Sequence, residues 1–96
     1  MKQALQTIAD QVCDERSFIN FLQVLSKDRA DEIEKGNSRS AYEPDCNGWE
    51  NGTIESFLEA ASVWADASLD GLPMYNKPEN PWTRCAHILL MGKLYE

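Results

Sequence analysis

Four stretches of this 96-residue chain repeat apolar residues at intervals of three and four, the spacing that places side chains on one face of an α-helix. The stretches cover residues 3–12, 15–34, 54–67 and 81–95. A chain of this length makes about one domain and buries enough surface for one core. The pattern therefore predicts a single all-α domain over residues 1–96, with four helices.

Start signals precede three of the four predicted helices. Asp14 and Thr53 are residue types that accept hydrogen bonds from the free amides at the start of a helix. Asn80 is followed by Pro81, and proline at the first helical position loses no hydrogen bond. We therefore expect the second, third and fourth helices to begin directly after these caps.

The apolar faces of the helices predict the core. Apolar residues cover most of the circumference of the fourth helix, so we expect it to be the central one, with Trp64 and Trp82 filling the core beside it. Gly92 near its end suggests either close approach by a neighbour or a fraying last turn. The predicted inner faces contain Leu5, Ile8, Ala9 and Val12 in the first helix, Phe18, Phe21, Leu22, Leu25 and Ile33 in the second, and Ile54, Phe57, Leu58, Ala61, Trp64 and Ala65 in the third.

Residues 36–52 interrupt the helical pattern with glycine, asparagine, serine and proline. An irregular connection of this length is unusual in a compact domain and indicates a functional or mobile segment. Trp49 in this loop either enters the core or is exposed to a partner.

The charge is concentrated in one part of the chain. The formal net charge is −7, and residues 41–70 contain seven acidic residues but no lysine or arginine. An acidic surface repels a phosphate backbone, which argues against nucleic-acid binding, and it attracts a basic protein. The seven acidic residues are Glu43, Asp45, Glu50, Glu55, Glu59, Asp66 and Asp70.

Three of these residues form one stripe on the third helix. Glu55, Glu59 and Asp66 fall on the side opposite the apolar face. Opposite charges four residues apart would stabilise such a helix by about 0.2–0.5 kcal/mol per pair. This helix has no basic residue and therefore lacks such pairs. We therefore predict a non-enzymatic binding protein whose acidic face engages a basic protein. The predicted face is made of Glu43, Asp45, Trp49, Glu50, Glu55, Glu59 and Asp66.

Thiol chemistry is the main alternative: a small enzyme or redox module using Cys46 or Cys85 with His87. Cys85 and His87 are two residues apart, about 200° around a helix, so they do not face each other. Cys13 adds an odd third thiol, which does not fit a disulfide framework. The spacings match neither a metal site nor a phosphate-binding loop, so no metal and no cofactor is expected.

The lengths of the apolar runs in the sequence indicate where the protein is located. None approaches the roughly 20 residues that cross a bilayer, and we expect no signal peptide before the first helix. We therefore expect a cytoplasmic protein without a membrane partner. It is expected to be a monomer or a weak homodimer. A structural homo-oligomer that associates through the fourth helix is a further alternative.

Two short motifs resemble those of a family of small uncharacterised bacterial proteins. One is Gly48-Trp49-Glu50-Asn51-Gly52-Thr53, which leads into the third helix, and the other is the terminal Leu94-Tyr95-Glu96. The resemblance covers most of residues 17–96 and implies no activity or catalytic residues. Small acidic bacterial domains of this sort also resemble immunity proteins, which neutralise nuclease toxins by covering a positively charged active site. That likeness implies a toxin as the basic partner.

Overall fold

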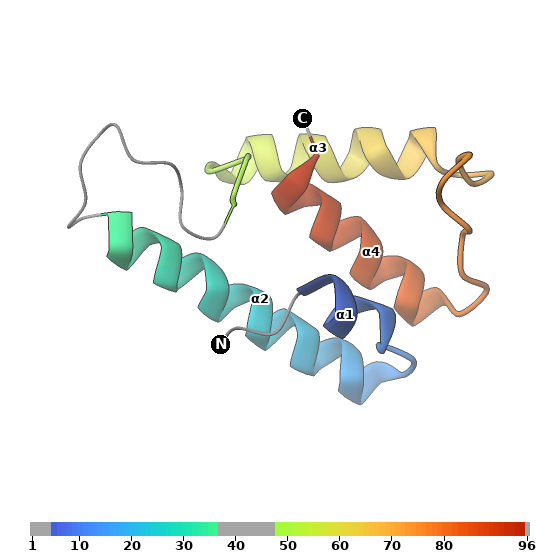
Figure 1. Cartoon of the computed structure of the whole chain (residues 1–96), viewed down its shortest axis with the longest axis horizontal. Coiled ribbons are helices and arrows are strands. Elements are labelled where there is room, and N and C mark those ends of the chain that lie inside the picture. The colour runs from blue at the N-terminus through green and yellow to red at the C-terminus, as the bar shows by residue number, and fades with distance from the viewer. Residues whose placement is uncertain (1–4, 37–47, 96) are drawn as a thin grey trace.

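The structure is a computed structural model that describes residues 5–36 and 48–95. Over these two ranges the chain forms four helices and no strand (Figure 1), which confirms the all-α prediction. The helices are α1 (Leu5–Asp10), α2 (Glu15–Gly36), α3 (Ile54–Ala67) and α4 (Pro81–Leu94). The predicted bounds of α3 are confirmed, whereas α1 ends two residues earlier than predicted, α2 two residues later and α4 one residue earlier.

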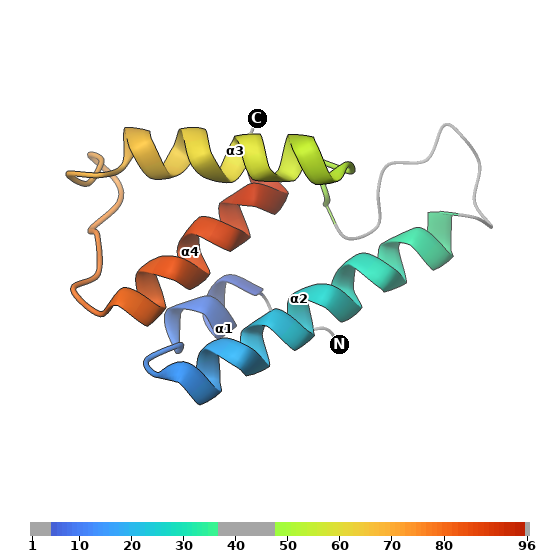
Figure 2. The ribbon, with the colours of Figure 1, turned by 180° about the vertical axis from the view of Figure 1, so that it is seen from behind.

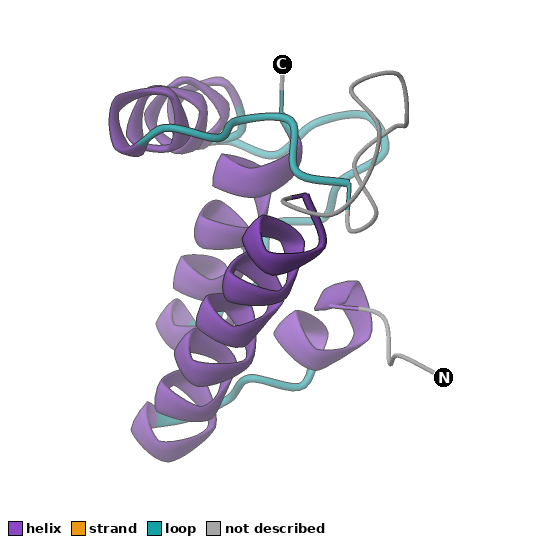
Figure 3. Cartoon of the chain, turned by 90° about the vertical axis from the view of Figure 1, so that its left-hand side faces the viewer, coloured by secondary structure: helices purple, strands orange, loops and turns teal. Residues whose placement is uncertain are grey.

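Helix α4 is the central element, as predicted. Figures 1 and 2 show it from opposite sides, between α3 on one side and the pair α1 and α2 on the other. Figure 3, which looks almost along α3, shows that helix at the top of the molecule, apart from α1. Among the described helices, α4 contacts the other three, and α2 does not contact α3. Helices α2 and α3 therefore pack on different sides of α4 and do not pack against each other.

The predicted caps are all present. The Thr53 hydroxyl accepts from the Ser56 amide at 3.1 Å, while the Ser56 hydroxyl accepts from the Thr53 amide at 3.2 Å. The Asn80 side chain accepts from the amide two residues on at 2.9 Å. The Asp14 carboxylate accepts from the hydroxyl and the amide of Ser17, and these bonds hold the pKa of Asp14 below its usual range. Local residue order thus decides where α2, α3 and α4 begin.

The main core lies where α1, α2 and α4 meet. Phe21 and Ala86 are fully buried there. The other buried members of this cluster are Leu5, Ala9, Val12, Leu25, Trp49 and Leu90. On the other side of α4, Trp64 of α3 is buried as predicted, with the Arg84 guanidinium of α4 5.2 Å from its ring centroid. A Cβ at Gly92 would lie 2.8 Å from the Phe57 ring, so this glycine marks a close approach of α3 and α4.

Five residues assigned to inner faces are exposed instead: Leu22, Ile33, Ile54, Leu58 and Trp82. Helix α2 is rotated from its predicted phase, because its buried residues are Phe21, Leu25, Asp28 and Glu32. Ile54 and Leu58 face the side of α3 that no described helix covers. Trp82 packs its ring against Phe18, at 5.6 Å between centroids, while 36% of the residue remains exposed.

Candidate functional site

The acidic stripe, defined as Glu55, Glu59 and Asp66, lies on the solvent side of α3. All three residues are exposed, as is Glu50 before the helix. Within the described residues, none of the four carboxylates has a hydrogen bond or an ion pair. Glu43 and Asp45, also predicted for this face, lie outside the described residues. The stripe is therefore a row of solvated negative charges without internal compensation.

Trp49 does not belong to the surface on which it was predicted. Only 7% of the residue is exposed. Its indole Nε1–H donates to the Asp28 carboxylate at 2.8 Å, and cations lie over its ring, with the Arg29 guanidinium 5.3 Å and the Lys93 ammonium 5.4 Å from the centroid. Trp49 therefore anchors its loop to the core. Its assignment to the predicted binding face was wrong, because its side chain is buried.

A buried ion pair supports that anchor. The Lys93 ammonium of α4 donates to the Asp28 carboxylate of α2 at 2.7 Å, and both side chains are less than 8% exposed. A charge in such a site is stable only when it is paired and hydrogen-bonded. The sequence contained a signal for this pair, because Asp28 occupies the same helical face as Phe21 and Leu25.

Two further side chains hold the segment between Trp49 and α3. The Asn51 amide donates to the carbonyl oxygens of Gly92 and Tyr95, at 3.0 and 2.7 Å, at the end of α4. The Arg29 guanidinium donates to the Gly52 carbonyl at 3.0 Å. The segment is thus tied to α2 and α4 before α3 begins, which sets where the acidic stripe lies.

An apolar groove of about 420 Å³ lies between the middle of α2 and the start of α3; we call it the α2–α3 groove. Three of its apolar lining residues are exposed: Leu22 at 40%, Ile54 at 80% and Leu58 at 58%. Its other lining residues are Leu25, Ser26 and Arg29 from α2, Trp49, Asn51, Gly52 and Thr53 from the connecting segment, and Phe57 from α3. Periodicity alone could not reveal this groove, since it placed the same apolar residues in the core.

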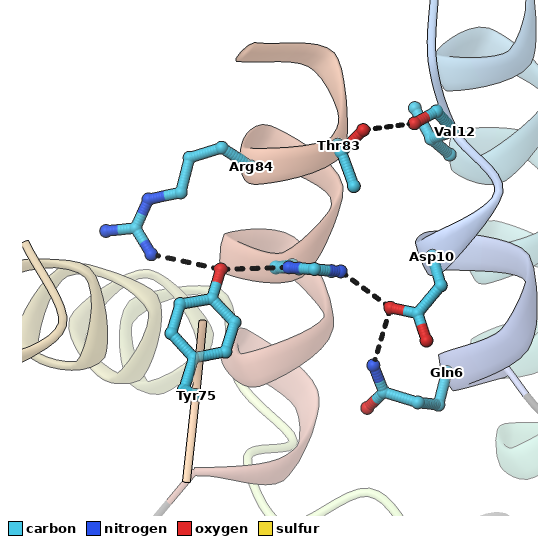
Figure 4. A network of polar contacts seen from close by, with 7 residues as sticks. Gln6, Asp10, Val12, Tyr75, Thr83 and Arg84 are labelled. Carbon is cyan, nitrogen blue, oxygen red and sulfur yellow. Dashed lines mark hydrogen bonds and ion pairs between the residues drawn. The ribbon is translucent and has the colours of Figure 1, made fainter. Parts of the chain in front are cut away.

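A chain of hydrogen bonds on the opposite side of α4 joins α1 to the α3–α4 connection (Figure 4). The Arg84 guanidinium lies 3.4 Å from the Tyr75 hydroxyl, which lies 2.9 Å from Nδ1 of His87. Nε2 of His87 lies 2.7 Å from the Asp10 carboxylate. Because arginine can only donate, the Tyr75 hydroxyl can accept from it and donate onward to His87. This order leaves the proton on Nε2, where it is donated to Asp10.

The geometry of this chain fits a structural link. Arg84 is buried, and it also donates to the Ser68 hydroxyl at 3.0 Å and the Ala65 carbonyl at 2.9 Å. The adjoining cavity of about 60 Å³ has the volume of about two water molecules. The chain therefore connects three elements around α4. Sequence patterns do not predict it, because Asp10 and His87 are far apart in the chain.

The residues of the thiol alternative are not brought together in the described part of the chain. Cys13 and Cys85 are exposed and unpaired, and Cys46 lies outside the described residues. Both ring nitrogens of His87 already have partners, Tyr75 and Asp10. Over residues 5–36 and 48–95, no group of three histidine, cysteine or acidic side chains could hold a metal ion. None of the described helices is both long and apolar enough to cross a membrane.

Comparison with known proteins identifies a family. The model of a family of unknown function, DUF7660, matches residues 14–96. Among curated proteins and among solved structures, none matches this chain. The resemblance to an uncharacterised family is therefore confirmed. The match begins after α1, although Leu5, Ala9 and Val12 belong to the main core.

Proposed function

We propose the following function for this chain, which belongs to the DUF7660 family of unknown function: it binds a basic protein through the acidic stripe. The binding is non-enzymatic and takes place in the cytoplasm. In its most specific form, the chain is an immunity-type inhibitor that covers a positively charged surface of a toxin or nuclease.

One observation carries the proposal: three basic side chains, Arg29, Arg84 and Lys93, are engaged within the fold, while the acidic stripe faces outward. Arg84 and Lys93 are buried, with their cationic groups hydrogen-bonded inside the fold. Arg29 donates to the connecting segment and lies over the Trp49 ring. The stripe has no such partners within the described residues. An ordinary solvated helix mixes signs, so this separation of charge favours a binding surface over plain solubility.

The physical consequence is steered association. Clustered negative charge raises the rate at which a basic surface arrives, and opposite charges then fix its orientation. Such steering is screened by salt, since the Debye length falls from about 30 Å at 0.01 M to about 3 Å at 1 M. Salt sensitivity is therefore the first property that the proposal requires.

Affinity capture from the source cell's lysate tests this function, with elution by salt and identification by mass spectrometry. We expect wild-type protein to retain a basic protein at about 0.01 M salt and to release it near 1 M. With the purified partner, the charge reversal Glu55→Lys/Glu59→Lys is expected to slow association at least tenfold, because it removes the attraction that steers the encounter.

A matched control separates the stripe from net charge. Glu34→Lys/Glu79→Lys changes the charge by the same amount at exposed positions outside the stripe, and it should leave most of the association rate intact. Equal rates for wild type and the stripe reversal would overturn the proposal. Replacing Cys46 and Cys85 by serine addresses the thiol alternative, because charge-driven binding requires neither thiol.

A further inference from the structure

We propose that the α2–α3 groove receives an amphipathic helix of the basic partner, with the apolar face of that helix in the groove and its basic flank against the acidic stripe. This inference rests on the proposed function and names the element of the partner that is recognised. It also accounts for exposed apolar residues that the acidic stripe alone leaves unexplained.

The walls of the groove are suited to apolar side chains. Ile54 and Leu58 stand one helical turn apart on α3 and are 80% and 58% exposed, and Leu22 faces them from α2 at 40%. Burial of apolar surface contributes about 25 cal/mol per Å², so an occupant that covers these side chains gains affinity from each. Helices α2 and α3 each contact α4 but not each other, and the groove lies between them.

Three of the polar side chains that line the groove are already engaged within the fold. Arg29 donates to the Gly52 carbonyl, and the Asn51 amide donates to the end of α4. The Thr53 hydroxyl is used in the cap of α3. A polar small molecule needs placed donors and acceptors for orientation, and these lining groups are committed elsewhere. The groove therefore favours apolar side chains.

The dimensions fit the spacing of anchors on a helix. Leu22 and Arg29 are seven residues apart on α2, which corresponds to about 10 Å at a rise of about 1.5 Å per residue. Helices that bind in grooves insert side chains at i, i+3 or i+4, and i+7, which span the same length.

Charge complementarity decides which helix fits. Glu55 and Glu59 each follow an exposed apolar residue of the groove, Ile54 and Leu58, and so lie about 100° further around α3. A helix seated in the groove has one flank beside these carboxylates, and lysine or arginine there meets opposite charge. A second copy of this chain is disfavoured as the occupant, because each copy has a net charge of −7.

The test uses three synthetic peptides of about 18 residues, long enough for five helical turns. The first combines leucine at helical spacing with lysine elsewhere, the second has glutamate for each lysine, and the third scrambles the sequence of the first. Affinity is measured by calorimetry on the full chain, and the binding site is mapped by NMR. We expect the first peptide to bind at least tenfold more tightly than the other two, with shifts at the Trp49 indole N–H in the groove floor.

Matched variants of the chain locate the contact. Ile54→Ser/Leu58→Ser removes two exposed apolar walls, and we expect at least tenfold weaker binding of the lysine–leucine peptide. Val63→Ser changes an α3 residue that is 49% exposed and does not line the groove, so binding should stay within twofold. The stripe reversal Glu55→Lys/Glu59→Lys should also weaken binding at least tenfold.

The outcomes distinguish the two proposals. If the wall variant binds like wild type while the stripe reversal does not, the groove is refuted and the acidic face stands. Full binding by the stripe reversal overturns the basic occupant and the proposed function together. A concentration-dependent dimer that the wall variant abolishes, measured by sedimentation, makes a second copy the occupant and overturns the proposal.

Discussion

Among single residues, the buried charges of Asp28 and Lys93 are the least expected feature of the fold. They join α2 to α4 at 2.7 Å, and Asp28 also holds the indole of Trp49. Attraction in such a site offsets a large desolvation cost only when both partners are present. The pair therefore behaves as one unit in which each charge requires the other.

Loss of one member of the pair is predicted to be costly. Lys93→Met leaves the Asp28 carboxylate buried without its ammonium partner, and we expect it to lower the free energy of unfolding by about 3–5 kcal/mol. Neutralising the partner as well, in Asp28→Asn/Lys93→Met, should restore part of that loss, since an amide oxygen at position 28 can still accept from Trp49. Urea denaturation of wild type and both variants measures the coupling.

Lys27 provides the control, because it lies on α2 and is exposed. Lys27→Met should change the free energy of unfolding by less than about 0.5 kcal/mol. Equal effects of Lys27→Met and Lys93→Met would show that the ion pair does not contribute to stability.

Between helices, Gly92 determines how closely α4 approaches α3. A Cβ there would lie 2.8–3.0 Å from three atoms of the Phe57 ring. That ring also packs against Trp49, at 6.1 Å between centroids, so it has limited room to move. The close approach of the two helices thus depends on the absence of a side chain at position 92, although glycine is a poor helix former.

Gly92→Ala is predicted to destabilise the protein even though alanine favours a helix by about 1 kcal/mol. Overpacking against Phe57 costs about 1–3 kcal/mol, which outweighs that gain. Thermal unfolding followed by circular dichroism should show a lower Tm. In the background of Phe57→Leu, where the ring is absent, Gly92→Ala should lower Tm less. A higher Tm for Gly92→Ala alone would refute the close contact.

In the molecule as a whole, α1 completes the core although the family match begins at residue 14. Leu5, Ala9 and Val12 are buried against the rest of the chain. The hydrogen bond from His87 to Asp10 and that from Thr83 to the Val12 carbonyl tie this segment to α4 (Figure 4). The core therefore includes residues that precede the part of the chain matched by the family model.

Deletion of residues 1–12 is predicted to lower the free energy of unfolding by about 4 kcal/mol, counting the burial of Leu5 and Val12 at about 1.5–3 kcal/mol each. The free energy of unfolding of a small domain is about 5–15 kcal/mol, so the deletion would remove much of the stability. Urea denaturation measures the loss. Ala9→Asp, on the buried face of α1, should also lower the free energy of unfolding, whereas Thr7→Asp, on the exposed face, should not. An unchanged urea midpoint after the deletion would exclude α1 from the core.

The four helices, and the starting points of α2, α3 and α4, could be predicted from residue order alone. Apolar spacing indicated four helices, and the caps at Asp14, Thr53 and Asn80 were confirmed in their local hydrogen bonds. These features depend on residues within about one turn of each other, so no knowledge of distant neighbours is needed to predict them. The exposed position of the acidic stripe followed from the same periodicity.

Which apolar faces are covered depended instead on how the helices pack. Periodicity placed Ile54 and Leu58 on an apolar face of α3, but α4 covers only part of that face and leaves the groove beside it. Trp49 likewise entered the core because Asp28 and Lys93, distant in sequence, surround it. A helix pattern defines a face, whereas the neighbour that covers it depends on how all four helices pack around one core.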